Sequence, residues 1–158
     1  MLPRLRLLFL LLLTLAATLP SAWSQTAGWI WSGGEENPER PLFFRRVFTI
    51  ESGIRGGQLD LLCKEEATVF LNGKEIGRAS GELMSHQIRT GLTGGKNVLA
   101  VRVKNAASRA GLIAVLRIEE EYGKSKVIVS DRSWLTSTAE VSGWEKAGFD
   151  SKGWTPAA

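Results

Sequence analysis

The sequence has a single cysteine and a single histidine, and this scarcity removes several kinds of site. Cys63 has no second cysteine with which to form a disulfide, and Cys63 and His86 alone cannot supply the ligands of a His/Cys zinc centre. No Cys-x-x-Cys-His motif occurs, so haem cannot be attached to the chain in that way. Cys63 alternates in step with Leu59 and Leu61, which predicts a small buried core residue.

Motifs that carry catalysis are also missing. In residues 77–81, Ser80 stands one position away from where a nucleophile elbow needs its serine. Gly123-Lys124-Ser125 resembles the end of a phosphate-binding loop, but Ile118 occupies the position of the required upstream glycine. The consecutive acids 119–121 alternate faces on a strand, which favours a solvated strand end over a pair of catalytic acids. We therefore expect no enzymatic activity in this chain.

The first 24 residues have the pattern of a secretory signal peptide. Arg4 and Arg6 form a basic start, Leu7–Leu15 is an apolar run too short to span a bilayer, and Ala22-Trp23-Ser24 suits a signal peptidase. The prediction is an exported protein, periplasmic or extracellular, with no membrane span after cleavage. Removing residues 1–24 from the 158-residue chain leaves 134, enough for one domain with a core.

The net charge of the chain is small once the leader is removed. Of the 20 basic residues, Arg4 and Arg6 leave with it, so 18 basic residues face 16 acidic ones and the net charge falls from +4 to +2. The remaining basic residues are scattered, with no run longer than Arg45-Arg46. This distribution argues against a nucleic-acid partner.

The mature sequence consists of short strand-like runs separated by turn signals, with no helical period over three turns. Asn72-Gly73 is the clearest turn, because both positions of a type I′ hairpin need a positive φ. Val129 is followed by an irregular tail whose tryptophans we expect to pack over the sheets. The pattern predicts an all-β fold, an antiparallel jelly-roll β-sandwich. The expected strands are 42–50, 58–63 after a break at Gly56-Gly57, 67–71, 74–79, 97–104, 111–122 and 126–129.

Several motifs, in this order, resemble one family. They are Phe44-Arg45-Arg46-x-Phe48, Val69-Phe70-Leu71-Asn72-Gly73, Asn97-Val98-Leu99-Ala100-Val101 and Asp131-Arg132-Ser133-Trp134, framed by Trp29-Ile30-Trp31 and Phe149–Trp154. Together they resemble galactose-binding-like jelly-roll domains, in particular the amino-terminal sugar-binding-type domains of bacterial alpha-L-rhamnosidases and of family-two glycoside hydrolases. The resemblance implies one such domain over residues 28–158, with an incomplete C-terminal edge.

The resemblance also implies a function. We expect an exported, non-catalytic accessory module of a larger protein, whose partner is a glycan or a neighbouring domain. Two alternatives stay open: a purely structural interdomain scaffold, and the front end of a glycoside hydrolase of the alpha-L-rhamnosidase type. No cofactor is expected. The question of a structural calcium ion stays open, since only the spacing of Glu35, Glu36 and Asn37 suggests a cation site.

Candidate ligand-binding residues come from two expected loops, 77–87 and 105–110, and from Trp144 in a loop that contains Gly and Lys, because binding on a rigid sandwich normally lies in loops. They supply the planar donors and amides that sugar hydroxyls need. The tryptophans offer stacking faces for sugars, although we expect Trp29, Trp31, Trp134 and Trp154 to serve mainly as anchors. The candidates are Arg78, His86, Asn105, Arg109 and Trp144.

Overall fold

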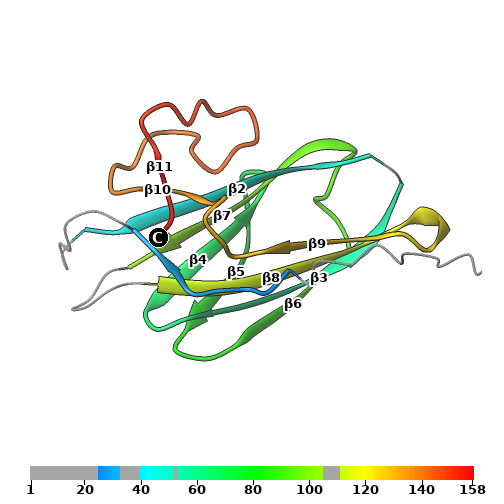
Figure 1. The fold of residues 1–158 in the computed structure, drawn as a ribbon, viewed down its shortest axis with the longest axis horizontal. Helices are drawn as coiled ribbons and strands as arrows, with labels where there is room; N and C mark the ends of the chain where they lie inside the picture. The colour runs from blue at the N-terminus through cyan, green and yellow to red at the C-terminus, as the bar shows by residue number, and fades with distance from the viewer. Residues whose placement is uncertain (1–24, 33–39, 52, 105–110) are drawn as a thin grey trace, which may run out of the picture.

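The computed structural model describes residues 25–32, 40–51, 53–104 and 111–158. The expected signal peptide lies outside these residues. Two antiparallel sheets pack face to face as a β-sandwich (Figure 1). The elements are β1 Ile30–Trp31, β2 Leu42–Ile50, β3 Ile54–Cys63, β4 Glu66–Leu71, β5 Lys74–Ser80, β6 Met84–Ile88, β7 Gly95–Val103, β8 Gly111–Glu120, the 3-10 turn η1 Glu121–Gly123, β9 Ser125–Val129, β10 Leu135–Ser137 and β11 Thr155–Pro156.

The five-stranded sheet has the order β1-β8-β3-β6, and β9 also pairs with β8. The six-stranded sheet has the order β11-β10-β2-β7-β4-β5. Alternation along each strand sends apolar side chains into the space between the sheets. Leu59, Leu116 and Val101 are fully buried there, together with Cys63 as the sequence predicted. The all-β prediction is confirmed.

The Asn72-Gly73 hairpin is confirmed in its detail. Both residues have positive φ, 51° and 87°, and they connect β4 directly to β5. The Asn72 side chain contributes further, because its amide donates to the Gly91 carbonyl and its oxygen accepts from the Val98 amide, each at 2.8 Å. The turn is therefore tied to the start of β7 as well as to its own hairpin.

The irregular tail covers the outer face of the six-stranded sheet, where a second apolar cluster forms. Trp144 is 4% exposed there and meets the edge of Phe43 at 5.0 Å and of Phe70 at 5.6 Å between ring centroids. Trp154 stacks on Trp144 at 6.2 Å. Figure 1 shows the tail, orange to red, rising above β2 and β10. Packing of the tail through tryptophans is confirmed.

A buried arginine fastens this tail. Arg45 points outward from β2, is 1% exposed and donates to the carbonyl oxygens of Lys146 at 3.0 Å and Phe149 at 3.4 Å, and to the Ser151 hydroxyl. Its guanidinium carbon also lies 5.1 Å from the centre of the Phe149 ring. Burial lowers the pKa of Arg45. Polar contacts and apolar packing thus hold the same segment.

Two boundaries differ from the sequence prediction. Gly56-Gly57 lies inside β3, where the register with β8 shifts between Ile54 and Gly56, so the glycines mark a bulge and not a break. The expected loop 77–87 is wrong over most of its length, because 77–80 belong to β5 and 84–87 to the edge strand β6. The polar residues Ser85 and Gln87 of β6 face solvent, and His86 takes an inward position. Because an inward position is occupied by a histidine, the sequence of β6 lacks the regular apolar–polar alternation that predicts a strand.

Candidate functional site

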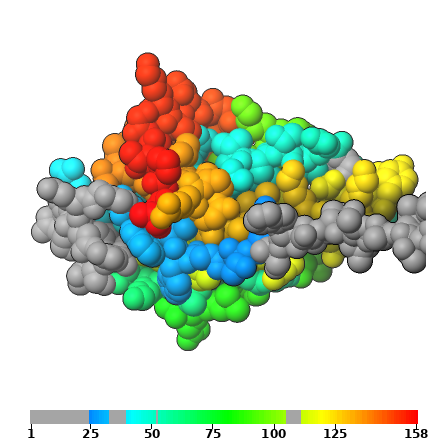
Figure 2. Space-filling view, in the orientation of Figure 1, coloured from blue at the N-terminus to red at the C-terminus, as the bar shows by residue number. Residues whose placement is uncertain are grey.

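A small hollow lined by two tryptophans opens at one end of the sandwich. Trp29, Trp31, Lys64 and Gly111 enclose about 270 Å³. These residues meet because Cys63, at the end of β3, pairs with Leu112, while Trp31 pairs with Gly111. In Figure 2, residues 25–31, in blue, lie across the surface of the molecule. We call this the tryptophan hollow.

Alternation in β1 positions both indole rings. Ile30 is 2% exposed and anchors the strand in the core opposite Leu112, so its neighbours Trp29 and Trp31 face away from the core. Trp29 remains 41% exposed, and Trp31 is half-buried. The backbone of Trp31 exchanges two hydrogen bonds with Ala158, of 3.0 and 3.3 Å. The rings are therefore carried by a fixed strand.

Gly111 keeps the hollow open. A Cβ atom at this position would lie 3.0 Å from the Ile30 carbonyl oxygen and 3.6 Å from Cε3 of Trp29. A larger side chain at position 111 would displace the Trp29 ring or fill the space in front of it. The absence of a side chain lets the strand and the indole approach closely.

The hollow combines two kinds of chemistry. The faces of Trp29 and Trp31 are apolar, and an indole N–H is a hydrogen-bond donor. The exposed Lys64 adds an ammonium group with three donors. A flat apolar face next to polar donors matches a sugar ring, which has an apolar C–H side and hydroxyl groups around its edge. The arrangement can therefore hold a pyranose.

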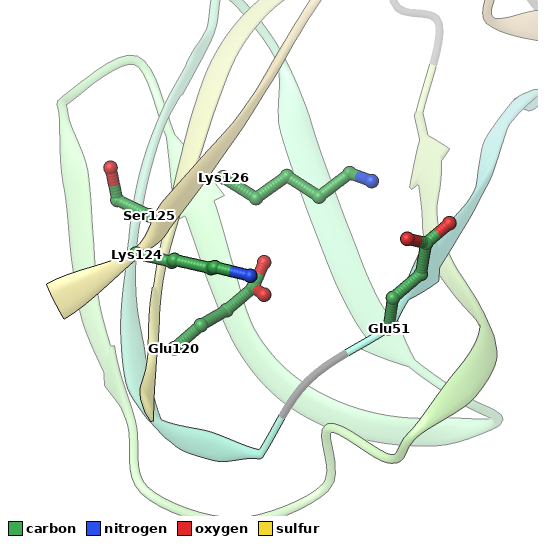
Figure 3. Close-up of a pocket in the computed structure, with 5 residues that line it drawn as sticks. All are labelled: Glu51, Glu120, Lys124, Ser125 and Lys126. Atoms are coloured by element: carbon green, nitrogen blue, oxygen red, sulfur yellow. The ribbon is translucent and has the colours of Figure 1, made fainter. Parts of the chain in front are cut away.

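A larger hollow of about 640 Å³ lies at the opposite end of the sandwich and is lined by polar and charged residues. Glu51, Glu120, Lys124, Ser125 and Lys126 line it (Figure 3). Lys126 donates to the Thr49 carbonyl at 2.7 Å, and Figure 3 shows Lys124 directed at the Glu120 carboxylate. Two ammonium groups face two carboxylates here. With its charges matched internally and no aromatic face, this hollow fits a sugar less well than the tryptophan hollow.

Three of the predicted site residues are described, and they lie in three different parts of the fold. Arg78, on β5, is exposed and pairs with Glu75 at 2.9 Å, so it belongs to the six-stranded sheet. His86 lies opposite Leu59 on β6, an edge strand of the five-stranded sheet. Trp144 is enclosed by the tail cluster, so its ring offers no open face to a ligand. Asn105 and Arg109 fall outside the described residues.

The sequence showed part of the tryptophan hollow. From Trp29-Ile30-Trp31 we expected anchoring rings, with stacking on a sugar as the alternative, and nothing in the sequence indicated which faces the rings would take. No sequence motif pointed to Lys64 or Gly111 as site residues, since only strand pairing brings the β3–β4 turn next to the start of β8.

The described part of the chain holds neither a cluster of metal-ligating side chains nor a membrane-crossing helix. Within residues 25–32, 40–51, 53–104 and 111–158, no group of three or more His, Cys, Asp or Glu side chains is arranged to hold a metal ion. Glu35, Glu36 and Asn37 lie outside these ranges. No helix formed by the described residues is long and apolar enough to cross a membrane.

Comparison with known proteins identifies the kind of domain. No protein-family model and no curated protein matches the chain. Among solved structures, it is similar to part of the alpha-L-rhamnosidase of Streptomyces avermitilis, solved in complex with L-rhamnose, at 30% identity and a TM-score of 0.75. That match covers 83% of this chain and 14% of the rhamnosidase. The chain thus has the fold of a β-sandwich segment found inside a much longer glycosidase.

Two further structures support this likeness. A family-78 rhamnosidase of Bacillus sp. GL1 matches at 25% identity and a TM-score of 0.70, over 84% of this chain and 18% of that one. The lectin of Pleurotus ostreatus, solved in complex with GalNAc, shares the fold at 22% identity and a TM-score of 0.75, over 83% of this chain and 40% of the lectin. The resemblance to alpha-L-rhamnosidase domains drawn from the sequence motifs is confirmed.

Proposed function

We propose that this chain is an exported, non-catalytic carbohydrate-binding module of the galactose-binding-like jelly-roll type, working within a larger protein. The observation that carries the proposal is the tryptophan hollow, which Trp29 and Trp31 line together with Lys64. In this proposal one ring stacks on the apolar side of a terminal sugar while the Lys64 ammonium group donates to its hydroxyls.

The solved relatives support a sugar as the ligand. The matched rhamnosidase was solved with L-rhamnose, and a lectin of the same fold was solved with GalNAc. Because the chain spans only 14% of that rhamnosidase, the activity of a whole glycosidase does not transfer to it. Terminal L-rhamnose and GalNAc are therefore the first sugars to test.

A glycan array with three proteins tests the proposal. The wild-type chain should bind a subset of glycans above background. Trp29→Ala should reduce that signal about tenfold, which corresponds to the loss of a contact of about 1.4 kcal/mol. The control is Tyr122→Ala, because Tyr122 is 88% exposed on η1, away from the hollow, and its loss should leave binding unchanged.

The array also distinguishes the alternatives. No glycan signal for the wild type would leave the interdomain scaffold as the better description. Equal loss of signal in the Trp29 and Tyr122 variants would show that sugar binds elsewhere. Melting curves of both variants should match the wild type closely, because neither ring belongs to the core.

A further inference from the structure

A third hollow lies on the outer face of the five-stranded sheet and is rich in arginine. It encloses about 200 Å³ between the ends of β3, β6 and β8. Gly56 takes the outward position opposite Glu119 and has no side chain with which to fill the space. The polar side chains that line it are Arg55, Gln58, Gln87, Arg89, Arg117 and Glu119. We call it the arginine hollow.

One wall of the arginine hollow is fixed by a side-chain network across three strands. Gln87 donates to the Gln58 side chain, whose amide donates to Asp60 at 3.0 Å and to Ser85 at 3.2 Å. Arg117 pairs with the same Asp60 at 2.7 Å. Since each side chain holds the next, the amides of Gln58 and Gln87 and the guanidinium of Arg117 keep their orientation without a ligand.

The other wall carries two arginines that pair with none of the residues the structure describes. Arg55 and Arg89 are both exposed, and neither forms an ion pair or side-chain hydrogen bond with any residue that the structure describes. The lining therefore holds three guanidinium groups against one carboxylate, that of Glu119, and Arg117 is already engaged by Asp60. The field in the hollow is positive and favours an anion.

We propose that the arginine hollow binds the anionic group of an acidic glycan, a carboxylate or a sulfate, and so adds a second site to the proposed function. The planar guanidinium groups of Arg55 and Arg89 suit two-point recognition of such oxyanions, while the amides of Gln58 and Gln87 reach neighbouring hydroxyls. No aromatic side chain lines the hollow for base stacking, and the basic residues of the chain are scattered. Both facts favour a glycan over a nucleic acid.

Dextran, carboxymethyl dextran and dextran sulfate provide matched probes, because they share one backbone and differ in the anionic group. Binding is measured by biolayer interferometry at constant ionic strength for the wild type and two double variants. Arg55→Gln with Arg89→Gln removes the proposed contacts. Arg102→Gln with Arg132→Gln removes the same charge from exposed positions outside the hollow.

The wild type should bind at least one charged polymer and prefer it to neutral dextran, and the polymer bound identifies carboxylate or sulfate as the anion. The Arg55/Arg89 variant should lose about tenfold or more in affinity, as expected for charge-assisted hydrogen bonds, while the Arg102/Arg132 variant stays within about threefold. Equal losses in both variants, or no binding of either charged polymer, would overturn the proposal. Stronger competition by single-stranded RNA than by the polymers would overturn the choice of a glycan.

The binding test with charged polymers can succeed or fail independently of the glycan-array test of the proposed function. Trp29→Ala should leave binding of the charged polymers at the arginine hollow unchanged, because the hollow shares no residue with the tryptophan hollow. Loss of polymer binding in the Arg55/Arg89 variant alone would therefore support the second site even if the glycan array gave no signal.

Discussion

Replacing Trp144 by alanine removes the centre of the packing that holds the tail on the six-stranded sheet. The indole is 4% exposed and contacts the rings of Phe43, Phe70 and Trp154. No other side chain of the tail reaches into this cluster as deeply, since Phe149 and Trp154 are only partly buried against it. The variant leaves a void beneath a segment that continues into β11.

The size of the effect follows from burial and ring contacts. Truncating a buried tryptophan to alanine costs about 3–5 kcal/mol of stability. Loss of the edge-to-face contacts with Phe43 and Phe70 places the change in the upper half of that range, since such pairs contribute about 0.5–1.5 kcal/mol each. For a domain of this size, the melting temperature should fall by about 10–25 °C.

Urea unfolding followed by circular dichroism and by tryptophan fluorescence measures the change. Tyr122→Ala, at an exposed aromatic, should remain within about 0.5 kcal/mol of the wild type. A Trp144→Ala variant less than about 1 kcal/mol below the wild type would refute the view that this cluster contributes to the stability of the whole domain. The tail would then be an appendage that the sandwich does not need.

Three further predictions concern single positions. Gly73→Val should destabilise the chain by about 1–2 kcal/mol relative to Lys74→Ala, since Gly73 has a φ of 87°, and equal melting temperatures would count against it. Burial raises the pKa of the Cys63 thiol, so stability should fall as pH rises through that pKa, and Cys63→Ala should lack this loss in denaturation curves above pH of about 8. Hydrogen bonds from Ser85 and Gln58 lower the pKa of the Asp60 carboxyl. Stability should therefore be lost as pH falls through that lowered pKa, and a similar acid loss in Asp60→Asn would contradict this.

Strands whose two faces differ in polarity could be predicted from the sequence alone. The range 42–50 expected for the first long strand is that of β2. On β8, the expected inward residues Leu112, Ala114, Leu116 and Ile118 are all buried. β8 could be predicted because a half-buried strand imposes a period of two on its own residues. β2 is buried on both faces over much of its length, and its richness in aromatic and β-branched residues marks it as a strand.

Elements stabilised by distant partners could not be predicted in the same way. β6 is polar on its outer face and carries His86 on its inner face, so only pairing with β3 identifies it as a strand. β10 is three residues long and exists because it pairs with β2 on one side and β11 on the other. In both cases the segment is a strand because of its partner strands, and its own sequence does not predict one.

The candidate site, too, could be predicted from the sequence only in part. Trp29 and Trp31 could be noted in the sequence as possible sugar-stacking residues. Their proximity to Lys64 and Gly111 depends on the register of β1, β3 and β8. The tail also accounts for the burial of Val98 and Ala100 on the outer face of β7. That face is covered by the cluster around Trp144.

The central claim, that sugar binds at the tryptophan hollow, is tested most directly by the indole N–H signals in a ¹⁵N-labelled sample. A glycan identified on the array is titrated into the protein, and each signal is assigned by single substitution. The account predicts that the signals of Trp29 and Trp31 shift progressively, while those of the buried Trp134 and Trp144 stay in place. Saturating binding with no shift of Trp29 or Trp31 would contradict it.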